Sequence, residues 1–207
     1  MRPIGSTKDR QPIFQEEFDR LIELTKHDKD IQKNTKLKLL RAYTLLYLTG
    51  CRVSEIINFT CKDLETIIRH KAISLGNDTK TKKPRALLFN DEGIAMLTKL
   101  SYVDCPKNSE AFFYSNTYDT PMSDAVFTRI LNSHLSEKMG GLYTTHSFRA
   151  GYVTRIVEAT GNIEIARSLV GHSSIKTTME YLSATPKQMN DAINKIFPSR
   201  KADVHDA

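Results

Sequence analysis

The feature that most constrains this chain is the apolar run that closes a helix predicted over residues 36–49. The run, residues 45–48, leaves the end of that helix apolar on nearly every side. Such a helix has no polar face to present to water, so it must be covered by other elements. Gly50 follows the run and ends the helix. We therefore expect amphipathic helices to pack around residues 36–49.

Several other segments have the periodicity and end signals of amphipathic helices. Apolar residues recur at three- and four-residue intervals, and Asn90 and Ser123 stand where a helix N-cap is needed. Gly161 and Gly171 follow the last residues of two further predicted helices. The predicted helices comprise residues 14–25, 53–59, 90–100, 145–159 and 162–170, one starting at Ser123, a short one before Tyr181, and a last one from Pro186 to Phe197.

Residues 63–89 differ in character from the rest. They contain three short β-prone runs, Ile67–Ile68, Ala72–Leu75 and Ala86–Phe89, separated by polar residues. The connection over residues 76–84 is long and rich in lysine, so we expect it to project from the sheet. The predicted fold class is mainly α with a small antiparallel β-sheet.

Composition favours a globular protein with a polyanionic partner. The 207 residues are 40% hydrophobic and 26% charged, and the net charge is +6 with a pI of about 9.2. Charge alone does not establish nucleic-acid binding, because many basic proteins bind none. No apolar run approaches the roughly 20 residues that a membrane span requires, and residues 1–10 do not resemble a signal peptide. We expect a cytoplasmic, nucleoid-associated protein.

Five polar residues could together attack a phosphodiester with a protein hydroxyl. Two arginines can hold phosphate oxygens through their planar forks and neutralise charge as it builds. Histidines transfer protons near neutral pH, and a tyrosine is a nucleophile whose phenolate can leave again. The residues are Arg52, His146, Arg149, His172 and Tyr181.

With the motifs around them, these residues resemble the tyrosine recombinase (phage integrase) family. The resemblance covers about residues 12–198 and corresponds to the catalytic domain of the family. The matching motifs, in order, are Thr49-Gly-Cys-Arg52-Val-Ser-Glu55, Thr79-Lys80-Thr-Lys82-Lys83-Pro-Arg85, His146-Ser-Phe-Arg149, Leu169-Val-Gly171-His172 and Tyr181.

This resemblance implies a domain organisation. Residues 1–12 would be a flexible lead-in, residues 13–198 the catalytic domain, and residues 199–207 a tail. Most relatives also carry an N-terminal helical domain that closes around the opposite face of the duplex. A naturally short member and an excised catalytic domain are both compatible with the sequence.

The resemblance also implies a role for each residue. Arg52 and Arg149 would clamp the scissile phosphate, with Glu55 bracing that region. Tyr181 would attack phosphorus, leaving a 3′-phosphotyrosine and a free 5′-hydroxyl. A 5′-hydroxyl from another strand could reverse the step without ATP. No metal or other cofactor is implied, because the arginines take the charge-neutralising role.

The remaining roles concern protons and DNA contacts. By the same resemblance, His146 accepts the tyrosine proton and His172 hydrogen-bonds a non-bridging oxygen. Lys80 is favoured as the group that protonates the leaving 5′-oxygen. The candidate DNA contacts are Lys82, Lys83 and Arg85.

The family implies DNA recombination or integration, for example of a mobile element, on double-stranded DNA. Strand exchange needs several active sites, so a homo-oligomer, a tetramer, is expected on DNA. The helix over residues 186–197 would connect neighbours, although it could equally pack on its own domain. Two alternatives remain: a type IB topoisomerase or telomere resolvase, and a catalytically silent DNA-binding regulator of the same fold. His146 stands where type IB topoisomerases usually carry lysine, which argues against a topoisomerase.

Overall fold

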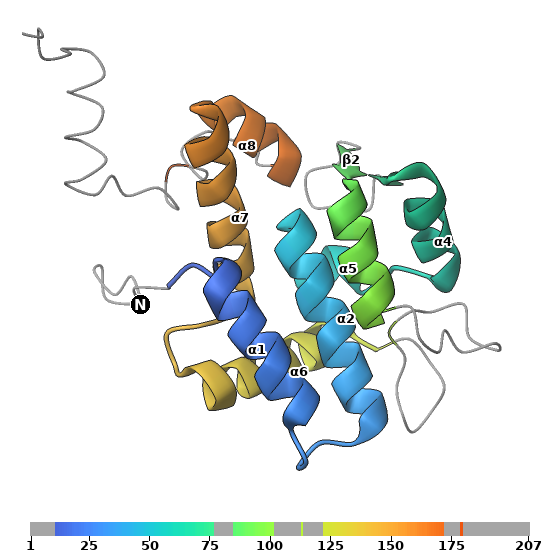
Figure 1. Cartoon of the computed structure of the whole chain (residues 1–207), viewed down its shortest axis with the longest axis vertical. Coiled ribbons are helices and arrows are strands. Elements are labelled where there is room, and N and C mark those ends of the chain that lie inside the picture. Colours follow the sequence, from blue (N-terminus) through green and yellow to red (C-terminus); the bar gives the residue numbers. More distant parts are fainter. Residues whose placement is uncertain (1–10, 77–84, 102–112, 114–121, 172–178, 180–207) are drawn as a thin grey trace, which may run out of the picture.

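Helix α2 (Lys33–Thr49) runs through the middle of the fold (Figure 1). The computed structural model of the chain describes residues 11–76, 85–101, 113, 122–171 and 179. The other elements in chain order are α1 (Gln15–His27), α3 (Val53–Ile56), α4 (Cys61–His70), β1 (Ala72–Leu75), β2 (Arg85–Leu88), α5 (Asp91–Ser101), α6 (Asp124–Met139), α7 (Thr145–Thr160) and α8 (Ile163–Val170). Helices α1, α3, α5 and α7 all contact α2, and Leu45 and Leu46 are fully buried among them. The apolar run of α2 therefore lies in the core, as its sequence predicts.

Most of the predicted helices within the described residues are confirmed, together with their caps. The side-chain oxygen of Asn90 accepts a hydrogen bond from the Gly93 amide at 2.8 Å at the start of α5. Ser123 and Asn162 cap α6 and α8 in the same way. Helix α3 is shorter than expected, since it ends at Ile56 instead of Phe59. The predicted mainly helical fold with a small antiparallel sheet is correct.

The prediction of a β-prone run at Ile67–Ile68 is wrong, because these residues lie in α4. Thr60 and Asp63 form a reciprocal capping box that starts this helix, with the Thr60 amide donating to Asp63 at 2.8 Å. Leu64 and Ile67, three positions apart, are then buried on one helix face. Capping and spacing outweigh the β propensity of two adjacent isoleucines.

Within the described residues the sheet has two strands, which pair antiparallel with Leu75 opposite Arg85. Side chains alternate between the two faces of a strand. In β2, Leu87 is 3% exposed and points inward, whereas Leu88 is 63% exposed and points outward. Arg85 lies two residues before Leu87, so its side chain is directed to the inner side, where β2 contacts α8.

Helix α7 is held close to the segment that leads into α1. The Ile13 amide donates to the Ser147 carbonyl at 3.0 Å, and the Ile13 side chain is fully buried. A Cβ atom at Gly151 would lie 2.0 Å from the Ile13 carbonyl oxygen. Only glycine allows this contact, which fixes residues 11–14 against the helix that carries Arg149.

In the described part of the chain, no helix combines the length and the apolar character that a bilayer crossing needs. Three expected features lie outside the described residues. They are the lysine-rich turn over 77–84, the short helix before Tyr181 and the helix over 186–197.

We predict that Gly151→Ala destabilises the protein by about 1–3 kcal/mol or more, because the added methyl must displace main-chain atoms of Ile13. Chemical denaturation measures the change in the free energy of unfolding. Gly141→Ala is the matched control, since a Cβ atom there meets no heavy atom within 4 Å. Equal stability of Gly151→Ala and wild type would contradict the close packing of Ile13 on α7.

Candidate active site

The carboxylate of Glu55 lies at the centre of the site. Helix α3 starts directly after Arg52, and Glu55 Oε2 accepts a hydrogen bond from the Arg52 amide at 2.6 Å. This is the return half of a capping box, which holds a glutamate at the third helical position against the helix start. The Glu55 side chain is only 4% exposed. Local helix capping therefore buries a negative charge beside Arg52.

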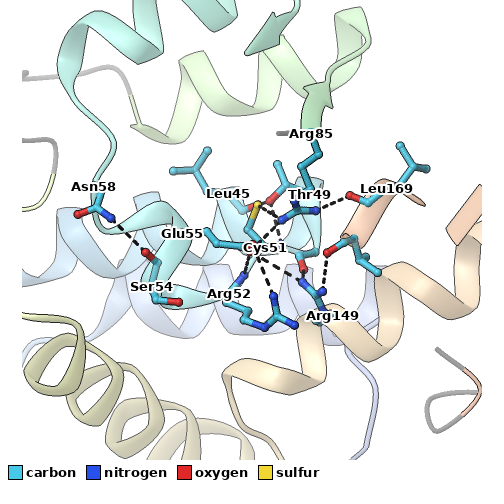
Figure 2. Close-up of polar contacts among 12 residues, drawn as sticks. Leu45, Thr49, Cys51, Arg52, Ser54, Glu55, Asn58, Arg85, Arg149 and Leu169 are labelled. Carbon is cyan, nitrogen blue, oxygen red and sulfur yellow. Dashed lines mark hydrogen bonds and ion pairs between the residues drawn. The ribbon is translucent and has the colours of Figure 1, made fainter. Parts of the chain in front are cut away.

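Three guanidinium groups surround this carboxylate (Figure 2). Arg85 Nη2 donates to Glu55 Oε2 at 2.8 Å. Arg52 Nη1 lies 3.6 Å from Oε1, and Arg149 Nη1 lies 3.9 Å from Oε2. A buried carboxylate needs such partners, since its charge is poorly solvated. The structure thus brings together the two arginines that the sequence predicts to clamp a phosphate.

Arg149 is fixed by the ends of two helices. Its Nη1 donates to the Gly50 carbonyl at 2.8 Å, and its Nη2 donates to the Val170 carbonyl at 2.5 Å. Gly50 and Val170 lie at the C-terminal ends of α2 and α8, where carbonyl groups lack partners within their helix. The side chain of Arg149 is 1% exposed, whereas that of Arg52 is 31% exposed. Arg52 therefore forms the solvent-facing side of the pair and Arg149 its buried side.

Arg85 does not occupy the position expected of a DNA contact. Its side chain is 8% exposed. Besides Glu55, its guanidinium donates to the Leu169 carbonyl and, at 3.4 Å, to Cys51 Sγ. The sequence contains a signal for this burial, because Arg85 and Leu87 are two residues apart in a strand and so point to the same face of the sheet. The structure gives Arg85 an internal role.

The stem of Arg85 also crosses the end of α8. Gly171 has a left-handed backbone, with φ of 68°, and ends the helix. A Cβ atom there would lie 2.9 Å from Arg85 Cδ. Gly171 is therefore required both for the turn and for the close approach of Arg85.

Of the remaining predicted site residues, the structure describes only His146. It lies in the first turn of α7, three positions before Arg149, and its side chain is exposed. Residues three apart share a helix face, so His146 lies on the Arg149 side of α7. Lys80, Lys82, Lys83, His172 and Tyr181 are outside the described residues. Within the described ranges, no three His, Cys, Asp or Glu side chains gather as metal ligands would.

Cys51 lies beneath the arginine cluster. Burial raises the pKa of its thiol to about 11, although the Arg85 guanidinium opposes this shift. The thiol is therefore neutral near pH 7 and is a poor nucleophile, because the thiolate is the reactive form. Cys51 contributes packing and a weak acceptor for Arg85, not chemistry.

The chain is similar to known proteins in sequence and in fold. Residues 13–188 match the sequence model of the phage integrase family. A tyrosine recombinase of Thermosipho africanus is 25% identical over 184 residues, covering 89% of this chain and 61% of the relative. The chain thus spans about three-fifths of the length of that protein.

Solved structures show the same fold at low sequence identity. The crystal structure of XerA recombinase superposes with a TM-score of 0.68 at 18% identity, covering 97% of this chain and 68% of the other. XerH site-specific recombinase, in a pre-cleavage complex with its difH substrate, gives a TM-score of 0.62 at 18% identity. The match covers 92% of this chain and 55% of the XerH chain. With the match over residues 13–188, these findings establish that the chain belongs to the phage integrase family.

Proposed function

We propose that this chain breaks and rejoins DNA strands as a site-specific recombinase, through a 3′-phosphotyrosine intermediate and without ATP or metal. The observation that carries the proposal is the convergence of Arg52 and Arg149 on one carboxylate. Residues 13–198 form the catalytic domain in this proposal, and the substrate is double-stranded DNA. The protein acts in the cytoplasm, on nucleoid DNA.

The two arginines stabilise the charge that develops on the phosphate. In-line attack on a phosphodiester places additional negative charge on the non-bridging oxygens. Arg149 is held by the Gly50 and Val170 carbonyls before substrate arrives, so it needs little reorganisation during reaction. Arg52 has the larger exposed surface and meets the phosphate first.

The covalent step exchanges one phosphate ester bond for another. The Tyr181 oxygen forms a bond to phosphorus while the bond from phosphorus to the 5′-oxygen breaks. His146 accepts the tyrosine proton, His172 hydrogen-bonds a non-bridging oxygen, and Lys80 donates a proton to the leaving 5′-oxygen. The reverse step, with a 5′-hydroxyl of another strand, completes the exchange. Lys82 and Lys83 contact the DNA backbone.

An apolar groove supports assembly into a homo-oligomer. Its volume is about 300 Å³, and it lies among α2, α7 and α8. Ile165, at its rim, is 41% exposed. The helix expected over residues 186–197 has an apolar face, and we assign the same helix of a neighbouring protomer to this groove. If each protomer donates this helix to the next and the fourth donates its helix to the first, the ring closes as the proposed tetramer on DNA. The groove is lined by Tyr47, Leu48, Tyr152, Arg155, Ile156, Ala159, Thr160, Ile165 and Leu169.

Covalent trapping tests whether Tyr181 is the nucleophile. Incubation of the protein with a nicked suicide duplex that bears its site should yield a covalent protein–DNA band on a denaturing gel. Tyr181→Phe should give no band while still binding the duplex, because only the attacking oxygen is removed. Tyr143→Phe, which removes a different phenolic oxygen, should keep the wild-type yield. A normal yield from Tyr181→Phe would refute the proposed mechanism.

Substitution of Arg149 tests its role in stabilising the transition state. Arg149→Ala should lose roughly 3 kcal/mol of transition-state stabilisation, about a hundredfold in the rate of covalent complex formation. Single-turnover kinetics at saturating protein measure this rate. Because Arg149 also holds two buried carbonyls, its variants must be checked for a cooperative unfolding transition. Arg149→Lys keeps the charge but not the fork, and should also be slow. A rate within threefold of wild type for Arg149→Lys is incompatible with bidentate clamping.

Deletion of the C-terminal residues tests the assembly of protomers on DNA. Deletion of residues 186–207 should leave binding of one protomer to one half-site and abolish cooperative assembly, as measured by gel shift across a protein titration. Ile165→Glu should have the same effect, since it places a charge in the apolar groove. Val126→Glu is the matched control, because Val126 on α6 is equally exposed, at 41%. Cooperative assembly by the deleted protein would exclude the connector role of the helix.

A further inference from the structure

The guanidinium group that lies closest to Glu55 is that of Arg85, not that of either arginine of the proposed phosphate clamp. Arg85 Nη2 and Glu55 Oε2 are 2.8 Å apart, within hydrogen-bond distance. The nearest guanidinium nitrogens of Arg52 and Arg149 lie 3.6 Å and 3.9 Å from the carboxylate, beyond that distance. Glu55 and Arg85 are 4% and 8% exposed, so solvent screens their pair only weakly. Glu55 and Arg85 therefore form the closest of the three ion pairs in the cluster.

This pairing determines how much charge the other two arginines can offer to a phosphate. The cluster contains three guanidinium groups and one carboxylate, and Arg85 balances Glu55. Three positive charges face one negative charge, so net positive charge remains around Arg52 and Arg149 for an anion. Without Arg85, the buried carboxylate would still need a partner. The nearest cations would be Arg52 and Arg149, each a small movement from direct contact.

We propose that Arg85 is a positioning residue for the recombination chemistry: it holds and neutralises Glu55, and thereby reserves Arg52 and Arg149 for the scissile phosphate. This inference rests on the proposed function. Arg85 touches neither DNA nor the reacting atoms in this account, and it acts through Glu55.

A second contact makes arginine, rather than any cation, suited to this position. One arm of the Arg85 fork donates to the Leu169 carbonyl while the other donates to Glu55. Arg149 binds the next carbonyl of α8, that of Val170. Two arginines thus fix consecutive carbonyls at the end of one helix, and Gly171 leaves space for the Arg85 stem. A lysine ammonium could pair with Glu55 but has no fork to reach both partners.

The test compares the rate of covalent complex formation in four proteins: wild type, Arg85→Gln, Arg85→Lys and the double variant Arg85→Gln/Glu55→Gln. Arg85→Gln should slow the reaction at least about tenfold, because Glu55 without Arg85 would pair with Arg52 or Arg149 and neutralise part of their charge. The double variant should recover at least half of that loss on a logarithmic scale, since no carboxylate remains to be balanced. Glutamine at position 55 can still accept the Arg52 amide hydrogen bond. Arg85→Lys should be faster than Arg85→Gln, because it keeps the charge.

If Arg85 had only a structural role, removing the Glu55 charge as well would not restore the rate of covalent complex formation. A double variant as slow as Arg85→Gln, or an Arg85→Lys variant as slow as Arg85→Gln, overturns the proposal. Arg129→Gln, the same substitution at an exposed position of α6, is the matched control and should react at the wild-type rate. Thermal unfolding of each variant sets an assay temperature at which all are folded. If Arg85→Gln does not fold, the rate of Arg85→Lys relative to wild type decides, and a loss above about a hundredfold overturns the proposal.

DNA affinity separates this role from a phosphate contact. Arg85→Gln should bind the duplex within about threefold of wild type, with an unchanged dependence of affinity on salt. Loss of a direct phosphate contact would weaken binding and lower the salt slope by about one, and that result contradicts the proposal. The wild-type covalent band in the same experiment tests the proposed function separately. Its absence overturns the recombinase proposal and the role of Arg85 with it.

Discussion

A buried carboxylate that has to be paired is the constraint on which this site depends. Glu55 is held in the interior by the capping of α3, where its charge is costly unless cations surround it. The cations come from three separate parts of the chain: the start of α3, the start of β2 and the second turn of α7. The same electrostatic demand that stabilises the fold at this point gathers the guanidinium groups that the chemistry needs.

Helix ends supply the second half of the arrangement. The C-terminal carbonyls of α2 and α8 have no partners within their helices, and Arg149 donates to both. Arg85 adds the Leu169 carbonyl. Each helix end therefore gains one or two of the hydrogen bonds it lacks, while each arginine loses rotational freedom. In this way the ordinary requirements of helix termination produce a preorganised cluster of positive charge, and the preorganisation is available before any DNA binds.

Features that depend on local signals were predictable from the sequence. The buried helix before Gly50, the caps at Asn90 and Ser123, and the ends at Gly161 and Gly171 all follow from residue type and spacing. The β assignment of Ile67–Ile68 failed because the capping box of Thr60 and Asp63, at the start of the same helix, outweighed propensity. Arg85 was expected on DNA as part of the hairpin motif. Strand alternation directs its side chain inward with Leu87, but no local pattern encodes its pairing with Glu55, thirty residues earlier. The convergence of Arg52 and Arg149 was predicted only through family resemblance, since their spacing alone contains no distance information.

The central claim is that Arg52 and Arg149 share one oxyanion site while Arg85 stays on Glu55. Anomalous diffraction from crystals of the full chain soaked in tungstate tests this directly, because tungstate is a tetrahedral oxyanion with a strong anomalous signal. We expect a tungsten peak between the guanidinium groups of Arg52 and Arg149, with the Arg85–Glu55 pair intact. A tungsten peak bound by Arg85 away from Glu55, or none near the Arg52–Arg149 pair when other sites are occupied, would contradict it.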